Sequence, residues 1–268
     1  MPRTDDLAYH LRSLGRVLLG YSGGVDSSLL AVVARRALGR GDLLAVIGRS
    51  ASYPAVQYEG AIALAHRFDV PVFEVDTDEL DDPSYVANPR NRCYFCKSEL
   101  WRRLGAVAAE RGFTTIADGT NADDLLEHRP GAQAGRERTI RSPLADLGWT
   151  KADVRTVARE LHIPIWDAPA APCLASRIRH GVAVTHERLA QVERAEAFLR
   201  NLGIRGDLRV RHLGDIARIE VSPPELQRIQ AAWNAVEREL ESLGFDGVEL
   251  DPRGYRRGSL SVLGVAEA

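Results

Sequence analysis

The chain has 268 residues, of which 45% are hydrophobic and 27% charged, and its formal net charge is −2. These values are typical of a globular protein and exclude a disordered chain, a collagen and a small disulfide scaffold. They give no overall positive field for nucleic acid. No apolar run reaches the roughly 18 residues of a membrane span, and three cysteines suit no secreted disulfide framework. We expect a cytoplasmic protein with neither a membrane nor a nucleic-acid partner.

The first half alternates short apolar runs with helical patterns. Strands are predicted at 15–20, 42–47, 71–75 and 114–117, and helices at 28–38, 54–68 and 99–111. This order predicts an α/β fold in which helices cover both faces of a parallel sheet. The segments 78–92 and 121–141 are predicted as long loops, a class that often carries function.

The second half begins with a predicted helix over 150–161, capped by Thr150 with Asp153 in the capping-box position. Because residues 163–181 are irregular and contain three prolines, we place the junction there, between a first domain of residues 1–165 and a second of 166–268. The second domain is predicted as small and α+β. Its helices are expected at 187–202 and 224–243, and its strands at 207–213, 216–221 and near Val248.

The most informative local motif is Ser22-Gly23-Gly24-Val25-Asp26-Ser27-Ser28, between a strand and a helix. The glycines let backbone N–H groups approach an anion, and the helix N-terminus adds positive potential. The hydroxyls of Ser22 and Ser27 can bond phosphate oxygens. An acid in an anion site makes sense if Mg²⁺ bridges Asp26 to a nucleotide phosphate. A serine-capped helix after a glycine turn is the alternative without a ligand.

This loop resembles the pyrophosphate loop of the PP-loop ATP pyrophosphatases, an adenine-nucleotide α-hydrolase-like family. The resemblance implies cleavage of ATP between the α and β phosphates, adenylation of a substrate oxygen and release of pyrophosphate. It also implies that adenine is held at the end of the second strand, around Ile47 and Ser50. Gly119 follows the fourth strand, where open sheets place their ligands.

The three cysteines are Cys93, Cys96 and Cys173. A C-x-x-C pair can be a redox dithiol, half of a zinc site or part of an iron–sulfur cluster. Three thiolates suit a [4Fe–4S] cluster with one iron open for sulfide, whereas a structural zinc would need a fourth ligand. Free thiols or a disulfide are the remaining alternatives.

Over nearly its whole length the chain resembles the LarE family, the PP-loop sulfur transferases that help make the nickel-pincer nucleotide of lactate racemase. The segments that carry the resemblance are Ser22–Ser28, Arg92–Lys97, Asp118–Asn121, Ser142–Leu144, Pro172–Arg177 with Gly181, Arg209–His212, Ala217–Glu220 and Gly254–Ser259. The cysteine-centred and C-terminal segments are more specific than the loop alone.

The resemblance implies that ATP adenylates the carboxylates of pyridinium-3,5-dicarboxylate mononucleotide and that a sulfur nucleophile then displaces AMP to leave a thiocarboxylate. In single-cysteine members the cysteine matching Cys173 gives up its own sulfur. The additional pair Cys93 and Cys96 resembles the three-cysteine members, thought to hold a [4Fe–4S] cluster that carries an extra sulfide. We favour this second route because it allows repeated turnover, and it requires a sulfide source.

The resemblance also implies a substrate-phosphate site at Arg209 and Arg211, whereas exposed arginines on a sheet edge are the plainer expectation. Ser176 and Arg177 could orient substrate or only cap a helix. A homo-oligomer, a hexamer, is implied as well. The rival functions are a tRNA thiolase with a cluster, an amide-forming synthetase, and a redox-sensing or scaffold protein without ATP chemistry.

Overall fold

The computed structural model describes residues 4–126, 130–169 and 171–256. The chain forms two compact units, Met1–Glu79 with Asn91–Ala171 and Leu80–Arg90 with Pro172–Ala268. The division thus falls after residue 171, whereas the sequence places a boundary after residue 165, which stays a prediction. Each unit is described by itself. Among the described residues, no helix is long and apolar enough to cross a bilayer.

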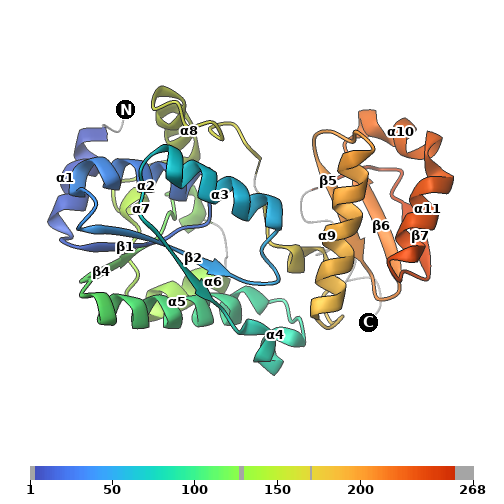
Figure 1. Cartoon of the computed structure of the whole chain (residues 1–268), viewed down its shortest axis with the longest axis horizontal. Helices are drawn as coiled ribbons and strands as arrows, with labels where there is room; N and C mark the ends of the chain where they lie inside the picture. Colours follow the sequence, from blue (N-terminus) through green and yellow to red (C-terminus); the bar gives the residue numbers. More distant parts are fainter. Residues whose placement is uncertain (1–3, 127–129, 170, 257–268) are drawn as a thin grey trace. The chain divides into compact units, whose positions relative to one another are not determined.

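The first unit is built on a four-stranded sheet in the order β3-β2-β1-β4 (Figure 1). All neighbouring strands run parallel. The strands are β1 (Val17–Gly20), β2 (Leu43–Arg49), β3 (Val72–Asp76) and β4 (Thr115–Ala117). The predicted α/β fold with a parallel sheet is therefore confirmed.

Both faces of this sheet are buried, as the continuous apolar strands require. Side chains alternate along β1: Val17 and Leu19 belong to one core cluster and Leu18 to the other. Residues of α1 (Thr4–Ser13), α2 (Val25–Leu38), α3 (Ala55–Arg67), α7 (Pro143–Asp146) and α8 (Lys151–Glu160) complete the first cluster. Those of α5 (Arg92–Arg111) and α6 (Pro130–Glu137) complete the second.

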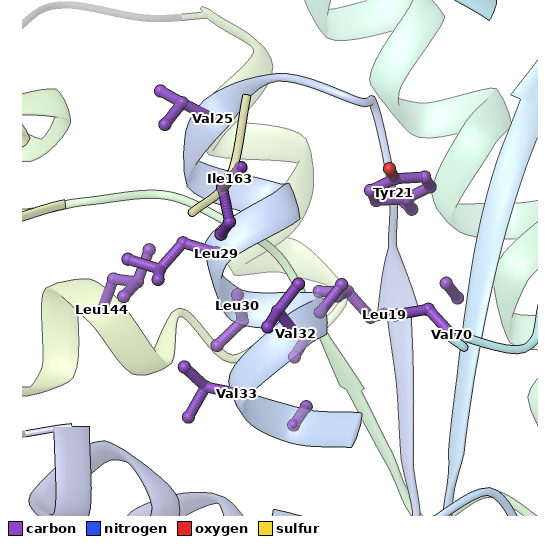
Figure 2. Packing of buried hydrophobic residues seen from close by; sticks show 14 of the residues in the cluster. Leu19, Tyr21, Val25, Leu29, Leu30, Val32, Val33, Val70, Leu144 and Ile163 are labelled. Carbon is purple, nitrogen blue, oxygen red and sulfur yellow. The ribbon is translucent and has the colours of Figure 1, made fainter. Parts of the chain in front are cut away.

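Helix α2 is the centre of the larger core cluster. Figure 2 shows Leu19 and Tyr21 on the sheet side of this helix, and Leu144 and Ile163 on another side of it. Because α2 is apolar on most of its faces, nine of its residues are buried. The loop that precedes α2 is consequently attached to the best-packed helix of the unit.

Two segments predicted as loops contain helices. Residues 78–92 include a 3₁₀ turn at Glu79–Asp81 and the short α4 (Pro83–Val86), and α5 begins at Arg92 rather than at Glu99. The early start of α5 was missed because its first two turns bury no apolar side chain and Asn91 makes no side-chain cap. Residues 121–141 include a 3₁₀ turn at Asp123–Leu125 and α6, while 127–129 lie outside the described residues.

The second unit packs three helices against a three-stranded sheet in the order β5-β6-β7. Strand β6 pairs antiparallel with β5 and parallel with β7. Its elements are α9 (His186–Asn201), β5 (Leu208–His212), β6 (Ile216–Val221), α10 (Leu226–Ala231), α11 (Trp233–Ser242) and β7 (Gly247–Leu250). The single helix expected over 224–243 is wrong, because the chain breaks at Ala232 between α10 and α11.

Leu80–Arg90 belongs to the second unit through the buried side chain of Asn88. Its amide nitrogen donates to the carbonyl oxygens of Ile178, Arg179 and Val182 at 2.8–3.3 Å. The N–H of Val184 donates to the carbonyl of Val86 at 2.9 Å. These bonds satisfy backbone carbonyls of an irregular segment that forms few regular hydrogen bonds of its own.

Candidate functional site

The predicted phosphate loop lies between the end of β1 and the start of α2. Gly23 has φ +66°, and a Cβ there would collide with Ala61 of α3. Only glycine meets both conditions without strain. The chain between β1 and α2 can therefore turn sharply at Gly23, so that α2 begins at the carboxyl edge of the sheet.

Ser22 and Ser27 of the loop are held by hydrogen bonds. Their hydroxyls lie 3.2 Å apart, and the Ser27 hydroxyl donates to the Gly24 carbonyl at 3.1 Å. The Tyr53 hydroxyl donates to the Ser22 carbonyl at 2.8 Å. Gly24 is the N-cap of α2 and offers no side-chain cap, so the unpaired N–H groups of the first turn suit an anion.

Asp26 lies in the first turn of α2, where its carboxylate has two donors. Oδ2 pairs with Nζ of Lys151 at 2.5 Å, and Oδ1 accepts from the Asn121 amide at 3.1 Å. Hard oxygen ligands of this kind, one carboxylate beside two hydroxyls and a phosphate, are what Mg²⁺ prefers. The donor set fits a magnesium ion that a nucleotide brings, with Asp26 as its protein ligand.

Gly119 follows β4 and lies against the start of α2. A Cβ at this position would be 2.7 Å from the backbone nitrogen of Ser27. Beside it, the Asp118 carboxylate accepts from the hydroxyls of Thr120 at 2.9 Å and Ser142 at 2.8 Å. The structure thus brings Gly119 together with Asp26 and Ser27 at one edge of the sheet.

Ile47 and Ser50 were expected to hold adenine. The Ile47 side chain is buried in the core and lies inside β2, which runs on to Arg49, so only its main chain could meet a ligand. The Ser50 hydroxyl donates to the buried carboxylate of Glu79 and accepts from the N–H of Ser52 at 3.0 Å. The adenine role of both residues stays a prediction.

Cys93 and Cys96 lie one turn apart in the first turns of α5, ahead of the helix start that the sequence predicts at residue 99. Cys93 is exposed and Cys96 is half-buried. Helix α6 packs closely on this turn, because a Cβ at Gly131 would be 3.3 Å from the Cys93 carbonyl oxygen. A spacing of three residues on a helix puts both thiols on one side, which suits shared ligation.

Cys173, in the second unit, precedes a 3₁₀ turn at Leu174–Arg177. Its carbonyl oxygen accepts from the Ser176 hydroxyl at 2.7 Å and from Nη1 of Arg177 at 3.0 Å. The Arg177 guanidinium also forms two 3.0 Å bonds with Glu196. Ser176 and Arg177 therefore hold the backbone of Cys173, and the charge of Arg177 is balanced by Glu196.

Arg209 and Arg211 are buried, with 8% and 6% of their surface exposed, so the expectation of a solvated edge is wrong. Arg211 pairs with the buried Glu220 at 2.8 Å. Arg209 stacks on Tyr255, 5.2 Å from the ring centroid. Burial, and then the nearby Arg177, lower the pKa of Arg209. The phosphate role of Arg209 and Arg211 stays a prediction.

Among the residues that the structure describes, no three or more His, Cys, Asp or Glu side chains form a group that could hold a metal ion. Two of the three thiols stand together on α5, and a [4Fe–4S] cluster needs the third. The donor chemistry of three cysteines suits such a cluster, while a complete ligand set is not seen in the described residues. Arg257, Gly258 and Ser259 of the last family-like segment lie outside those residues.

Known proteins resemble this chain over nearly all of its length. Residues 9–93 match the NAD synthase family. An uncharacterized protein of Synechocystis sp. is 41% identical over 97% of both chains. Pyridinium-3,5-bisthiocarboxylic acid mononucleotide synthase of Lactiplantibacillus plantarum is 35% identical over 94% of this chain and 91% of its own. This protein belongs to the LarE family. It is an ATP-dependent sulfur-transferring enzyme of the PP-loop class.

A more distant similarity covers only part of the chain. The glutamine-hydrolysing GMP synthase of Aeropyrum pernix is 29% identical over 67% of this LarE-family chain and 38% of its own. The NAD synthase match over residues 9–93 includes the loop Ser22–Ser28 and the start of α2.

Four polar residues to which the sequence assigned no site role contact predicted site residues: Lys151, Asn121, Glu196 and Glu220. Asn121 and Glu220 stand in the family-like segments Asp118–Asn121 and Ala217–Glu220. Lys151 had one usable signal, because it directly follows the helix-capping Thr150 and is one of only two lysines in the chain. Glu196 had none, since it pairs with Arg177 19 residues away.

Proposed function

We propose that this enzyme adenylates the carboxylates of pyridinium-3,5-dicarboxylate mononucleotide with ATP and converts them to thiocarboxylates, in the synthesis of the nickel-pincer nucleotide of lactate racemase. The observation that carries the proposal is the uncapped start of α2 behind Gly23 and Gly24, in a chain whose 35%-identical relative covers nearly its full length. That relative is named for the bisthiocarboxylic acid product.

The first step activates a poor acyl donor. A carboxylate oxygen of the substrate attacks the α-phosphorus of ATP, and the bond to the bridging oxygen breaks to release pyrophosphate. The backbone N–H groups after Gly24 and the hydroxyls of Ser22 and Ser27 bind the departing phosphates. Asp26 holds Mg²⁺, which neutralises phosphate charge when bound. The product is an acyl-adenylate, whose leaving group is AMP rather than oxide.

The second step transfers sulfur. A sulfur nucleophile attacks the acyl carbon, and AMP leaves with the original carboxylate oxygen, so that a thiocarboxylate remains. We propose that Cys93, Cys96 and Cys173 hold a [4Fe–4S] cluster, which supplies an open iron that can carry a sulfide. Ser176 and Arg177 position Cys173 through its carbonyl oxygen. Arg209 and Arg211 bind the phosphate of the mononucleotide substrate.

Adenylation is tested without any sulfur source. We expect the protein to exchange labelled pyrophosphate into ATP only when the pyridinium dicarboxylate mononucleotide and Mg²⁺ are present. Asp26→Asn should reduce the exchange rate by at least about a hundredfold, since it removes the metal ligand. If the exchange rate does not depend on the mononucleotide, or if exchange requires a tRNA instead, the proposed substrate is wrong.

The sulfur source is tested by counting product per protein chain. After anaerobic reconstitution with iron and sulfide, we expect visible absorption of a cluster and many thiocarboxylates per chain. Cys93→Ser should abolish both. Sacrifice of Cys173 would instead give one product per chain and a protein lighter by about 34 Da, the mass of hydrogen sulfide lost from a reactive cysteine. That result overturns the cluster and keeps the adenylation.

We also propose that the enzyme is a cytoplasmic homo-oligomer, a hexamer. Its first unit binds and cleaves ATP, and its second unit binds the substrate and contributes to assembly. It draws on a separate sulfide donor. Light scattering during size-exclusion chromatography measures the mass of the assembly, and a monomer would contradict this part.

A further inference from the structure

The ion pair between Asp26 and Lys151 raises a question about the order of binding. Asp26 is the residue expected to hold Mg²⁺, yet its Oδ2 is occupied by an ammonium at 2.5 Å. Oδ1 accepts from the Asn121 amide at 3.1 Å. A metal ion that binds Oδ2 meets the positive charge of the ammonium there, and of the two donors the lysine is the mobile one.

Asn121 is fixed in place. Its side chain is buried, its Oδ1 accepts from the N–H of Asp124, and its own N–H donates to the carboxylate of Asp124. Asn121 is therefore held in place, so its hydrogen bond orients the Asp26 carboxylate and is not easily broken. The side chains of Lys151 and Asp26 are 37% and 21% exposed, so their ion pair is partly solvated and weak enough to exchange.

The start of α8 fixes the backbone of Lys151 but not its ammonium group. Thr150 and Asp153 form a capping box, and the N–H of Lys151 donates to the Asp123 carboxylate at 2.8 Å. From this anchor a flexible four-carbon stem carries the charge to the phosphate loop. When a metal replaces it at Asp26, the ammonium stays within reach of the phosphates bound at the N-terminus of α2.

The residue type supports an exchanging role. Lysine occupies only two of the 35 basic positions of this chain. An arginine at 151 could bind the carboxylate through two parallel bonds, whereas an ammonium is a compact point charge that moves readily between acceptors. A lysine at this position therefore suits an ammonium group that must dissociate from the Asp26 carboxylate.

We propose that Lys151 and Mg²⁺ compete for the Asp26 carboxylate, so that the site takes up metal only together with a nucleotide, whose phosphates then receive the ammonium. Without nucleotide, the ion pair keeps the metal out and lowers the negative potential of Asp26 towards an incoming phosphate. With nucleotide, the two cations change places. Metal and nucleotide thus raise each other's affinity by the same factor, as linkage requires. This inference rests on the proposed ATP chemistry.

The test measures binding, not turnover, of Mn²⁺ in place of Mg²⁺ by electron paramagnetic resonance, with and without α,β-methylene-ATP. For Lys151→Met we expect opposite shifts. Metal alone should bind about tenfold more tightly, because its competitor is gone. The nucleotide with metal should bind about 10–100-fold more weakly, because a charge-assisted bond is lost.

Two further variants separate exchange from a merely structural role. Lys151→Arg keeps the charge, and we expect it still to exclude the metal but to weaken nucleotide binding, because its fork holds Asp26. Arg159→Gln removes a positive charge from the exposed side of the same helix, and we expect no change in either affinity.

The outcomes separate the two proposals. If Lys151→Met binds metal no more tightly than the unmodified protein, or keeps its nucleotide affinity, the exchange is wrong while the ATP chemistry stands. If the unmodified protein binds no nucleotide with metal present, the proposed function itself fails.

Discussion

Gly23 is the residue on which the shape of the phosphate loop depends most. Its positive φ disfavours any other residue, and a side chain there would collide with Ala61 unless α3 moved away from the loop. The carbonyl of the preceding Ser22 is held by Tyr53, so a shift at Gly23 would also disturb the Ser22 and Ser27 hydroxyls, which lie 3.2 Å apart.

We expect Gly23→Ala to lower the free energy of unfolding by about 1–3 kcal/mol, because a left-handed backbone strains a non-glycine residue. ATP affinity should fall at least about tenfold with it. Urea titration and a nucleotide-binding titration measure the two effects. The matched control is Gly60→Ala on α3, where a Cβ meets open space. It should be neutral or slightly stabilising, and equal effects of the two changes would contradict this account.

Arg211 and Glu220 form a buried ion pair in the second unit. We expect Arg211→Met to lower the free energy of unfolding by about 3–5 kcal/mol, because the buried charge of Glu220 would lose the guanidinium that pairs with it at 2.8 Å. The double variant Arg211→Met with Glu220→Leu should recover most of this loss. Urea denaturation of the three proteins tests the prediction, and a double variant as unstable as the single one would refute it.

At the scale of elements, the junction of β5 with α9 contains a buried titratable group. His212 is 2% exposed and lies 3.0 Å from the Gln191 side chain of α9. Burial, and then the nearby Arg188, lower the pKa of His212 from 6.5 to about 4. The folded state thus favours the neutral imidazole, while the unfolded chain binds a proton below about pH 6.5.

The pH dependence follows with a definite sign. Between pH 6.5 and 4 the unfolded state binds more protons at His212, so this residue makes stability fall as the pH falls through that range. In His212→Gln the slope of unfolding free energy against pH should be shallower there by up to one proton. Denaturation at a series of pH values measures the slope. An unchanged slope would mean that His212 is protonated in the folded protein.

Elements differ in how well the sequence predicted them. The four strands of the first unit were found because each contains a short apolar run, which is largely buried in β1 and β2 and partly buried in the edge strands β3 and β4. The start of α5 was missed because Arg92–Lys97 has no apolar periodicity, and this put Cys93 and Cys96 ahead of the predicted helix start at residue 99 instead of on one helical turn. Helix starts that depend on packing, without a cap, leave no local signal.

At the scale of the whole molecule, the parallel fold and the loop around Asp26 could be predicted from local sequence. The partners of charged groups could not. The pairing of Asp26 with Lys151 joins positions 125 residues apart, and the burial of Arg209 and Arg211 depends on residues such as Tyr255 and Glu220. Alternation alone predicted one solvated face for β5, where the structure has none.

In the proposed function, one chain joins ATP-driven carboxylate activation to transfer of inorganic sulfur. To test this, the reconstituted enzyme is supplied with ATP, Mg²⁺, the pyridinium dicarboxylate mononucleotide and isotopically labelled sulfide, and the products are weighed by mass spectrometry. We expect AMP, pyrophosphate and several labelled thiocarboxylates per chain. A product without the label, or an amide formed equally well from ammonia by Cys93→Ser, would show that the two reactions are not joined in this way.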